Sequence, residues 1–392
     1  MSIALLYERS ETDETGIKLT AQDMGIELTF VPFRKIALTI SKNGFSAKTR
    51  GKDYTNTFKD VAVALNRAQS KNRRLQAGYL MEMLGKKTIN SSQIEFTCYS
   101  KLRTLLHFWA DGIPIPKTVY VPCDTTDTLK DGREIHNEID IANLLQKEIA
   151  LDQGIVVKPD AGTHGKGAIL SHNRDQLVAS IQKTKPSIIN PVGVTAQELV
   201  EKWFYDLRII AYKEKGKPAV CHPVALARGG FKDFRTNTYL GNTVFDAKIP
   251  LPLQELAVKC GKALANDSEA WMFALDAMVN VGENKTVPDT EIQTDLEKAA
   301  AEFEKIRKVK QDENRLRNFP NWNTKLEAAF QTYMSTESYK KIKSIIDESI
   351  EKNKKAVVFH EANSCPEFWE HTRLIAGINV AVPLLKGAQS LI

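Results

Sequence analysis

The chain has 392 residues, enough for two or three domains with cores of their own. Charged residues make up 26% and hydrophobic residues 42%, as in an ordinary globular protein, and no apolar run approaches the roughly 20 residues that cross a bilayer. The net charge of +6 is diffuse and no basic run is interleaved with aromatics, so we expect neither a membrane nor a nucleic-acid partner. Five scattered cysteines without a CxxC pair indicate a reduced compartment, and the cytoplasm is the predicted location.

The first part of the chain alternates between short apolar runs and stretches with helical spacing. The elements predicted there are strands over Ile3–Tyr7, Ile26–Val31 and Ile36–Ile40 and helices over Thr15–Met24 and Asp60–Leu84. Gly85 follows the second helix and is a suitable residue to end it. This alternation predicts a small N-terminal α/β domain.

The middle of the chain continues with strand-like and helical segments. In Gly112–Val121 two prolines precede a strand, because proline is excluded from helix interiors. The elements predicted after it are a polar loop over Cys123–Glu138, helices over Ile139–Ala150 and Leu253–Leu264, and strands over Thr195–Val200, Leu207–Tyr212, Pro218–Ala227 and Met272–Val279.

The segment Val281–Lys355 differs in character from its surroundings. It is rich in Lys, Glu, Asp and Ala, and its apolar residues recur at helical spacing. Its charges nearly cancel, which is typical of the solvated faces of amphipathic helices. We therefore predict an inserted helical module, either a subunit contact or a cover for a substrate entrance, after which Ala356–His360 resumes the strand pattern.

The most informative segment is Ile155–Leu170, which reads IVVKPDAGTHGKGAIL. Two apolar runs flank a loop with three glycines, and this pattern predicts a hairpin. Glycines let the backbone approach a phosphate, and Lys158 at the end of the first run would add positive charge. The segment indicates a flexible lid over nucleotide phosphates, although most glycine-rich hairpins are only turns.

A candidate metal site combines residues of two predicted strands. Glu361 and Asn363 are two residues apart at a strand end, so they face the same side. Asp276 is a charge inside an apolar run, where an acidic group is seldom buried unless it is paired or bound to metal. Together they would suit Mg²⁺, which prefers oxygen ligands. The alternative is a capping Glu, a turn Asn and a salt-bridged Asp.

Between these segments lies a group of cationic residues. Arg228 and Arg235 bracket ARGGFKDFRTN, and arginine binds carboxylate and phosphate through a planar fork. This cluster indicates an anion site or, alternatively, a basic surface loop. Gln197 and Glu198 end a strand and would flank an adenine base. The competing phosphate motifs GxxxxGK[ST] and GxGxxG after a first strand are absent from the sequence.

The order of these motifs resembles that of the ATP-grasp ligases, in particular their RimK/LysX-like, glutathione synthetase-type branch. The likeness covers nearly the whole chain except Val281–Lys355. The matching pieces, in chain order, are NRA from Asn66, Arg73, INS from Ile89, Lys101, GIPIPKT, VVKPDAGTHGKG, QELV, DLRI, RTN, Gly241, Asp276 and HEAN. The sequence departs from the pattern at Thr163-His164 in the lid and at Asn242, where a serine and a second glycine are usual.

The resemblance implies an α/β and α+β protein with an ATP-grasp fold, an N-terminal pre-ATP-grasp domain and a helical insertion. The implied domains are residues 1–96, a central subdomain 97–194 with the lid, and a C-terminal subdomain 195–392 with the insertion 281–355. The implied nucleotide-binding residues are Lys101, Lys158, Gly162, Thr163, His164, Gly165, Lys166, Gly167, Gln197, Glu198, Leu199, Val200, Asp206 and Arg208. The implied ligands of Mg²⁺ or Mn²⁺, two ions in all, are Asp276, Glu361 and Asn363, and the implied catalytic residues are Arg228, Arg235 and Asn237.

The resemblance also implies an activity. A carboxylate would be phosphorylated by ATP, and an amine would attack the acylphosphate to give an amide, ADP and phosphate. We expect an amino acid to be added to an acidic small molecule, a peptide or a carrier protein, by a homo-oligomer such as a dimer or tetramer. The alternatives are an ATP-grasp kinase that phosphorylates a hydroxyl and a non-catalytic nucleotide-binding scaffold. The sequence identifies neither substrate.

Overall fold

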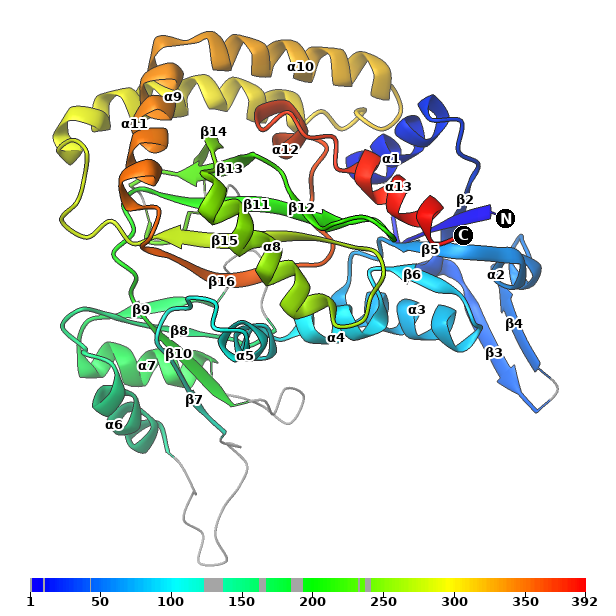
Figure 1. Ribbon diagram of the computed structural model, residues 1–392, viewed down its shortest axis with the longest axis horizontal. Coiled ribbons are helices and arrows are strands. Elements are labelled where there is room, and N and C mark those ends of the chain that lie inside the picture. The colour runs from blue at the N-terminus through cyan, green and yellow to red at the C-terminus, as the bar shows by residue number, and fades with distance from the viewer. Residues whose placement is uncertain are drawn as a thin grey trace, which may run out of the picture.

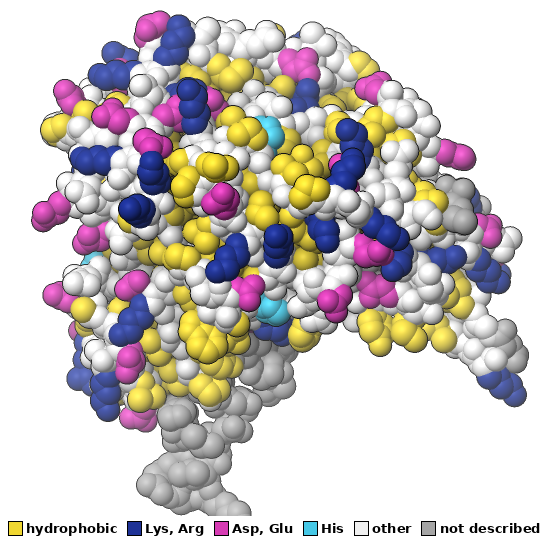
Figure 2. Space-filling view, viewed as in Figure 1, with side chains coloured by type: hydrophobic (Ala, Val, Ile, Leu, Met, Phe, Trp, Pro, Cys, Tyr) yellow, Lys and Arg dark blue, Asp and Glu magenta, His cyan; other side chains and the backbone are white. Residues whose placement is uncertain are grey.

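The structure of the protein is a computed structural model that describes residues 2–9, 11–42, 44–122, 137–161, 167–184, 193–231, 233–236 and 241–392. Within these ranges, sheets of four, four and six strands follow one another along the chain, and a two-stranded ribbon projects beside the first (Figure 1). Every helix of the described residues is too short or too polar to cross a membrane. On the face shown in Figure 2, cationic and anionic side chains are interspersed.

The first sheet is parallel and has the order β2-β1-β5-β6. Its strands are β1 (Ser2–Tyr7), β2 (Leu28–Pro32), β5 (Val61–Asn66) and β6 (Lys87–Ile89). The elements between them are α1 (Thr12–Asp23), η1 (Phe33–Lys35), the ribbon β3 (Ala37–Ser41) and β4 (Gly44–Lys48), α2 (Thr55–Asp60) and α3 (Lys71–Met83). The last helix of the chain, α13 (Ala381–Ser390), packs against β5, β6 and α1, so both termini lie at this sheet (Figure 1).

The predicted helix over Asp60–Leu84 is wrong in its first part. Val61–Asn66 forms β5, which pairs with β1 and β6 in the middle of the first sheet. A strand inside a parallel sheet is covered on both faces, so its sequence is a continuous apolar run that periodicity cannot distinguish from a buried helix. The helix begins only at Lys71, after the polar turn that follows β5.

The second sheet has the order β7-β10-β8-β9 and lies at the lower left of Figure 1. Its elements are β7 (Thr118–Val121), α6 (Glu138–Glu148), β8 (Ile155–Lys158), β9 (Ile169–Ser171), α7 (Arg174–Thr184) and β10 (Val194–Glu198). The helices α4 (Ser92–Tyr99) and α5 (Lys101–Ala110) connect it to the first sheet. Strands β8 and β9 pair antiparallel, which confirms the predicted hairpin. Its tip, residues 162–166, and the loop 123–136 lie outside the described residues.

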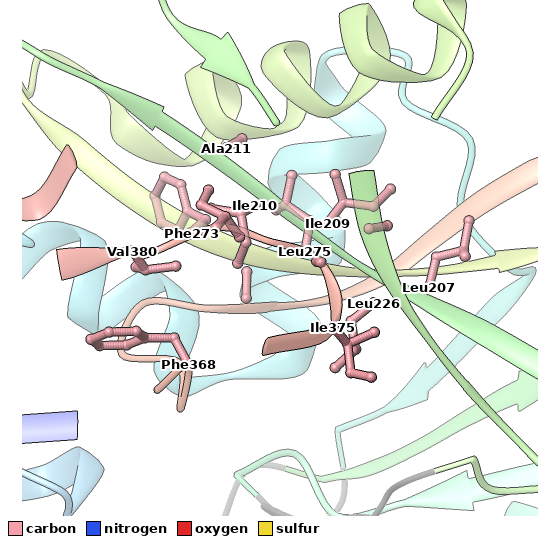
Figure 3. Close-up of a cluster of buried hydrophobic side chains, with 14 of the residues drawn as sticks. Leu207, Ile209, Ile210, Ala211, Leu226, Phe273, Leu275, Phe368, Ile375 and Val380 are labelled. Carbon is pink, nitrogen blue, oxygen red and sulfur yellow. The ribbon is translucent and has the colours of Figure 1, made fainter. Parts of the chain in front are cut away.

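The third sheet has the order β14-β13-β11-β15-β16, with β12 paired to β11. Its strands are β11 (Tyr205–Lys213), β12 (Val220–Cys221), β13 (Val224–Gly229), β14 (Thr243–Lys248), β15 (Trp271–Val279) and β16 (Val357–Asn363). Helix α8 (Leu251–Ala265) packs against β11, β12 and β15, and α12 (His371–Ile375) packs against β13 and β14. Figure 3 shows the core at this sheet, where Phe273 and Leu275 of β15 lie near Phe368, Ile375 and Val380 of the C-terminal segment.

The predicted helical insertion is confirmed by three helices above the third sheet (Figure 1). They are α9 (Asp289–Lys310), α10 (Phe319–Ser335) and α11 (Glu337–Asn353). Their apolar residues belong to the same buried cluster as the sheet, and two hydroxyls link the layers: Tyr333 donates to the Val244 carbonyl at 2.9 Å and Tyr205 to Ser349 Oγ at 3.0 Å. The insertion is therefore part of the main core. The predicted domain limits stay a prediction.

Candidate active site

A cavity of about 770 Å³ opens where the three sheets meet. It brings together most of the predicted site residues, although they come from segments far apart in the sequence. The predicted residues that line it are Lys101, Lys158, Gln197, Glu198, Leu199, Val200, Asp206, Arg208, Arg228, Arg235, Asp276, Glu361 and Asn363. The predicted residues 162–166 of the lid and Asn237 lie outside the described residues, and the neighbouring Gly167 has a positive φ of 80°.

The three proposed metal ligands meet on two adjacent strands. Asp276 of β15 pairs in register with Glu361 of β16, beside an irregularity in the ladder between Asp276 and Ala277. Asn363 lies two residues along β16, and its Nδ2 donates to Asp276 Oδ2 at 3.4 Å. The predicted common side of Glu361 and Asn363 is thus confirmed, because both side chains line the cavity.

Asp276 is also part of a buried network of carboxylates and guanidinium groups. Arg208 donates to both of its oxygens, at 2.9 and 3.0 Å, and Arg228 NH2 lies 3.3 Å from Oδ2. Arg228 in turn donates to both oxygens of Asp206 at 2.8 Å. Burial alone would raise the pKa of both carboxyls, but the arginines outweigh it and hold the pKa of Asp276 and Asp206 below their ordinary range. The sequence predicts that Asp276 is either paired with a cation or bound to a metal, and in the structure it is paired with Arg208 and Arg228.

The donor set fits a hard divalent cation. Despite burial, which acts to raise it, the pKa of Glu361 is lowered, mainly by Lys101, whose Nζ lies 3.9 Å away, so this carboxylate is ionised like Asp276. Two carboxylates and an amide supply only oxygen ligands and leave positions for phosphate oxygens, as Mg²⁺ sites in nucleotide-binding proteins do. No group of three or more His, Cys, Asp or Glu residues in the described ranges forms a rival metal site.

Two lysines line the cavity together with these acids, and one of them, Lys101, lies beside Glu361. Lys158 ends β8, and burial together with Lys101 lowers its pKa to about 8; its Nζ donates to Gln197 Oε1. Lys101 is the first residue of α5, where Ser100 accepts the Arg103 N–H and Asp160 accepts the Leu102 N–H at 2.8 Å. The positive end of this helix therefore adds to the charge of Lys101. These groups suit the phosphates of a nucleotide.

The segment after β10 is held by backbone hydrogen bonds. The Glu198 N–H donates to the Lys117 carbonyl at 3.0 Å, and the Glu198 side chain accepts the Lys117 N–H at 2.8 Å. The Leu199 N–H donates to the Gly154 carbonyl at 3.1 Å. This fixed backbone lines the cavity beside Val156. That it reads adenine stays a prediction, as does the role of Arg235, which pairs with Asp233.

Several cations of the cavity were not predicted from the sequence. Lys202 lies two residues after the QELV motif, and burial lowers its pKa to about 8. Its Nζ donates to Thr236 Oγ1 at 3.0 Å. Burial and Lys101 also lower the pKa of Lys71. Position next to a matched motif is the signal that would have identified Lys202. The same signal applies to Lys71, which lies between the matched NRA motif and Arg73.

The half of the cavity away from Lys158 was also missed. It is formed by the start of α1, by Arg67 after β5, by the loop after β16 and by the insertion, which contributes Lys310 and Arg315. Asp13 holds these parts together, because its Oδ1 accepts the backbone N–H groups of Phe368 and Trp369 at 3.0 and 2.8 Å. Its Oδ2 accepts from Arg67 NH2 at 3.1 Å. The insertion therefore forms a wall of the cavity, in agreement with a cover.

The sequence is similar to a known family of domains and to proteins named as ligases. Residues 129–303 match the model of the RimK-like ATP-grasp domain. The chain is 27% identical over 201 residues to the alpha-aminoadipate–LysW ligase LysX of Saccharolobus solfataricus, a match that covers 51% of this chain and 65% of the relative, just under two thirds. It is 28% identical over 275 residues to a probable alpha-L-glutamate ligase of Stenotrophomonas maltophilia, which covers 67% of this chain and 82% of the relative.

Solved structures show the same fold. A RiPP-associated ATP-grasp ligase of Chryseobacterium gregarium, in complex with ADP and a leader and core peptide, aligns over 100% of this chain and 96% of its own. The TM-score is 0.53 and the sequence identity 11%. The chain has the ATP-grasp fold, and the predicted fold class is confirmed.

Proposed function

We propose that this chain is an ATP-dependent carbon–nitrogen ligase that joins a carboxylate to an amine through an acylphosphate. Its match to the RimK-like ATP-grasp domain and to relatives named as ligases supports the proposal. One observation carries the proposal. Two ionised carboxylates and an amide, Asp276, Glu361 and Asn363, share a cavity with three partly buried lysines, which are Lys101, Lys158 and Lys202. Such a site suits a charged phosphoryl group held between cations and a metal.

The proposed reaction has two steps. A substrate carboxylate oxygen attacks the γ-phosphorus of ATP, the bond from that phosphorus to the bridging oxygen breaks, and ADP leaves. The amine nitrogen then attacks the carbonyl carbon, phosphate leaves, and the nitrogen loses a proton, which gives the amide. Lys101, Lys158 and Lys202 offset the charge of the phosphates, and Arg228 holds Asp206 and Asp276 in place.

Asp276, Glu361 and Asn363 are the proposed ligands of Mg²⁺, or of Mn²⁺ in its place. When bound, the ion supplies charge neutralisation at the phosphate oxygens. The presence of two ions is part of the proposal. Gln197 to Val200 form the proposed adenine contact, and the β8–β9 hairpin the proposed lid, which excludes water that would hydrolyse an acylphosphate.

The substrate class is proposed from the names of the relatives. Relatives are named for the ligation of alpha-aminoadipate to LysW and for alpha-L-glutamate ligation. These names support an amino acid as the amine substrate, joined to an acidic small molecule, a peptide or a carrier protein. A homo-oligomer in the cytoplasm is proposed for this enzyme.

The test measures ADP release from ATP and Mg²⁺ over a panel of carboxylates and amines, with mass spectrometry of the product. We expect ADP and phosphate in equal amounts and an amide whose mass is the sum of both substrates less water. Glu361→Gln should lower turnover by roughly 10²–10³-fold, because one negative oxygen ligand is lost. The control is Glu255→Gln, the same change on the exposed face of α8. Full turnover of the Glu361 variant, or a phosphorylated hydroxyl as product, would contradict the proposal.

A further inference from the structure

The half of the cavity beside α1 contains two buried charged groups with hydrogen-bonding capacity left over. Glu14 and Arg67 are 3% and 4% exposed, and both line the cavity. Glu14 Oε2 and Arg67 Nε have no hydrogen-bond partner among the described residues. A buried carboxylate oxygen or guanidinium N–H without a partner costs about 1–3 kcal/mol or more, so each requires an explanation.

The polar groups around these two atoms already form hydrogen bonds with other partners. Arg67 NH1 donates to the Pro366 carbonyl at 2.9 Å and NH2 to Asp13 Oδ2 at 3.1 Å, which leaves Nε facing Glu14 Oε1 at 3.6 Å. Asp13 is occupied by the backbone of Phe368 and Trp369. Glu14 is thus a buried acidic group of this corner with an oxygen that lacks a hydrogen bond, whereas Glu367, which also lines the cavity, is exposed to solvent.

The walls of this corner are held by close packing and by ion pairs. Gly16 of α1 has no side chain, and a Cβ there would lie 2.0 Å from the Trp369 ring, so α1 and the loop after β16 pack directly together. The insertion closes the other side, since Lys310 lies 2.7 Å from Glu370 and Arg315 lies 3.6 Å from Glu11. The positions of Glu14 and Arg67 are therefore set by three parts of the chain.

We infer that this corner binds a free amino acid as a zwitterion, with its ammonium group on Glu14 and its carboxylate on Arg67. A nucleotide phosphate fits poorly here, because Asp13 and Glu14 would repel it. An ammonium donates the hydrogen bonds that Glu14 Oε2 lacks, and a carboxylate accepts the one that Arg67 Nε lacks. The inference rests on the proposed function and names the part of the cavity that takes its amino-acid substrate.

The electrostatics agree with this geometry. Burial, with Asp13 as a second cause, raises the pKa of Glu14 to about 7, although Arg67 acts to lower it. The raised pKa shows that Arg67 does not fully compensate the charge of the Glu14 carboxylate, so a further cation beside Glu14 would stabilise its ionised form.

The experiment measures binding without turnover, by calorimetry in the presence of ADP and Mg²⁺. The probes are L-glutamate and L-2-aminoadipate, with glutarate and adipate as the same diacids without the amino group. We expect wild-type protein to bind at least one amino acid about tenfold or more tighter than its diacid, and Glu14→Gln to reduce that ratio to near one. ADP affinity should stay unchanged. Asp23→Asn, the same loss of charge at the exposed end of α1, should keep the wild-type ratio.

An unchanged ratio in Glu14→Gln overturns the inference, and so does ADP binding without binding of any of the four probes. Failure of the proposed function is distinct, since it appears as absent amide product in the turnover assay. If Glu14→Gln does not fold, N-acetyl-L-glutamate tests the same point on the wild-type protein. Acetylation removes the positive charge, so binding should weaken about tenfold or more, and equal binding of both compounds overturns the inference.

Discussion

Replacing Glu14 by glutamine should make the ligand-free protein more stable at alkaline pH. In the folded chain, burial raises the pKa of Glu14 from its ordinary 4.5 to about 7. A carboxyl whose pKa is raised on folding stabilises the protein while it is protonated in both states, below pH 4.5, and this stability is lost as the pH rises through 7. Glutamine resembles the protonated acid and has no such loss.

The size of the effect follows from the shift. A difference of about 2.5 in pKa corresponds to about 3 kcal/mol, since one unit is about 1.4 kcal/mol. For 392 residues, an unfolding entropy of about 2 cal/mol/K per residue converts this into about 4 °C in the thermal midpoint. Asp13 is present in both the wild type and the Glu14→Gln variant, so its own contribution to the pH dependence of stability cancels to a first approximation in the difference between them.

The assay is scanning calorimetry of both proteins between pH 5 and pH 8.5 at constant ionic strength. The midpoint of Glu14→Gln, relative to wild type, should rise by about 3 °C over this range, because part of the total effect of about 4 °C already develops below pH 5. Asp23→Asn on the same helix should show no such trend. A difference that is constant with pH, or a Glu14 variant that loses stability relative to wild type at alkaline pH, would refute the reasoning, because Glu14 would then be a satisfied carboxylate in the folded protein.

Nucleotide affinity and the insertion give two more predictions. Because the pKa values of Lys158 and Lys202 are lowered to about 8, both lysines lose their charge above pH 8, and Mg-ADP affinity measured by calorimetry should fall there. In Lys158→Met one of the two titrating groups is gone, so the fall in affinity with pH should be less steep. A variant with the same pH profile as wild type would contradict the role of Lys158. Deleting 283–352 behind a short linker should give unfolded or aggregated protein, because Phe303, Leu326 and their neighbours belong to the main core; a soluble, cooperatively unfolding product would contradict this.

Local sequence patterns predicted an element correctly where the residues that define it lie within one continuous segment. The β8–β9 hairpin shows as two apolar runs around glycines, and the insertion shows as helical spacing among charged residues. The common side of Glu361 and Asn363 follows from the two-residue period of a strand. By contrast, β5 has the same apolar composition as a buried helix, and only its pairing with β1 and β6 distinguishes the two.

The sequence by itself predicted most of the residues that line the cavity around Lys158, because they lie in motifs whose order along the chain is informative. The tertiary structure alone decided the other half of the cavity. Glu14, Arg67 and Lys310 lie in unrelated stretches of the chain and meet only because α1, the loop after β16 and the insertion pack against one another. It also decided that Asp276 is paired by two arginines, since that pairing depends on the alignment of β11, β13 and β15. Such contacts between distant segments leave no periodicity in the sequence.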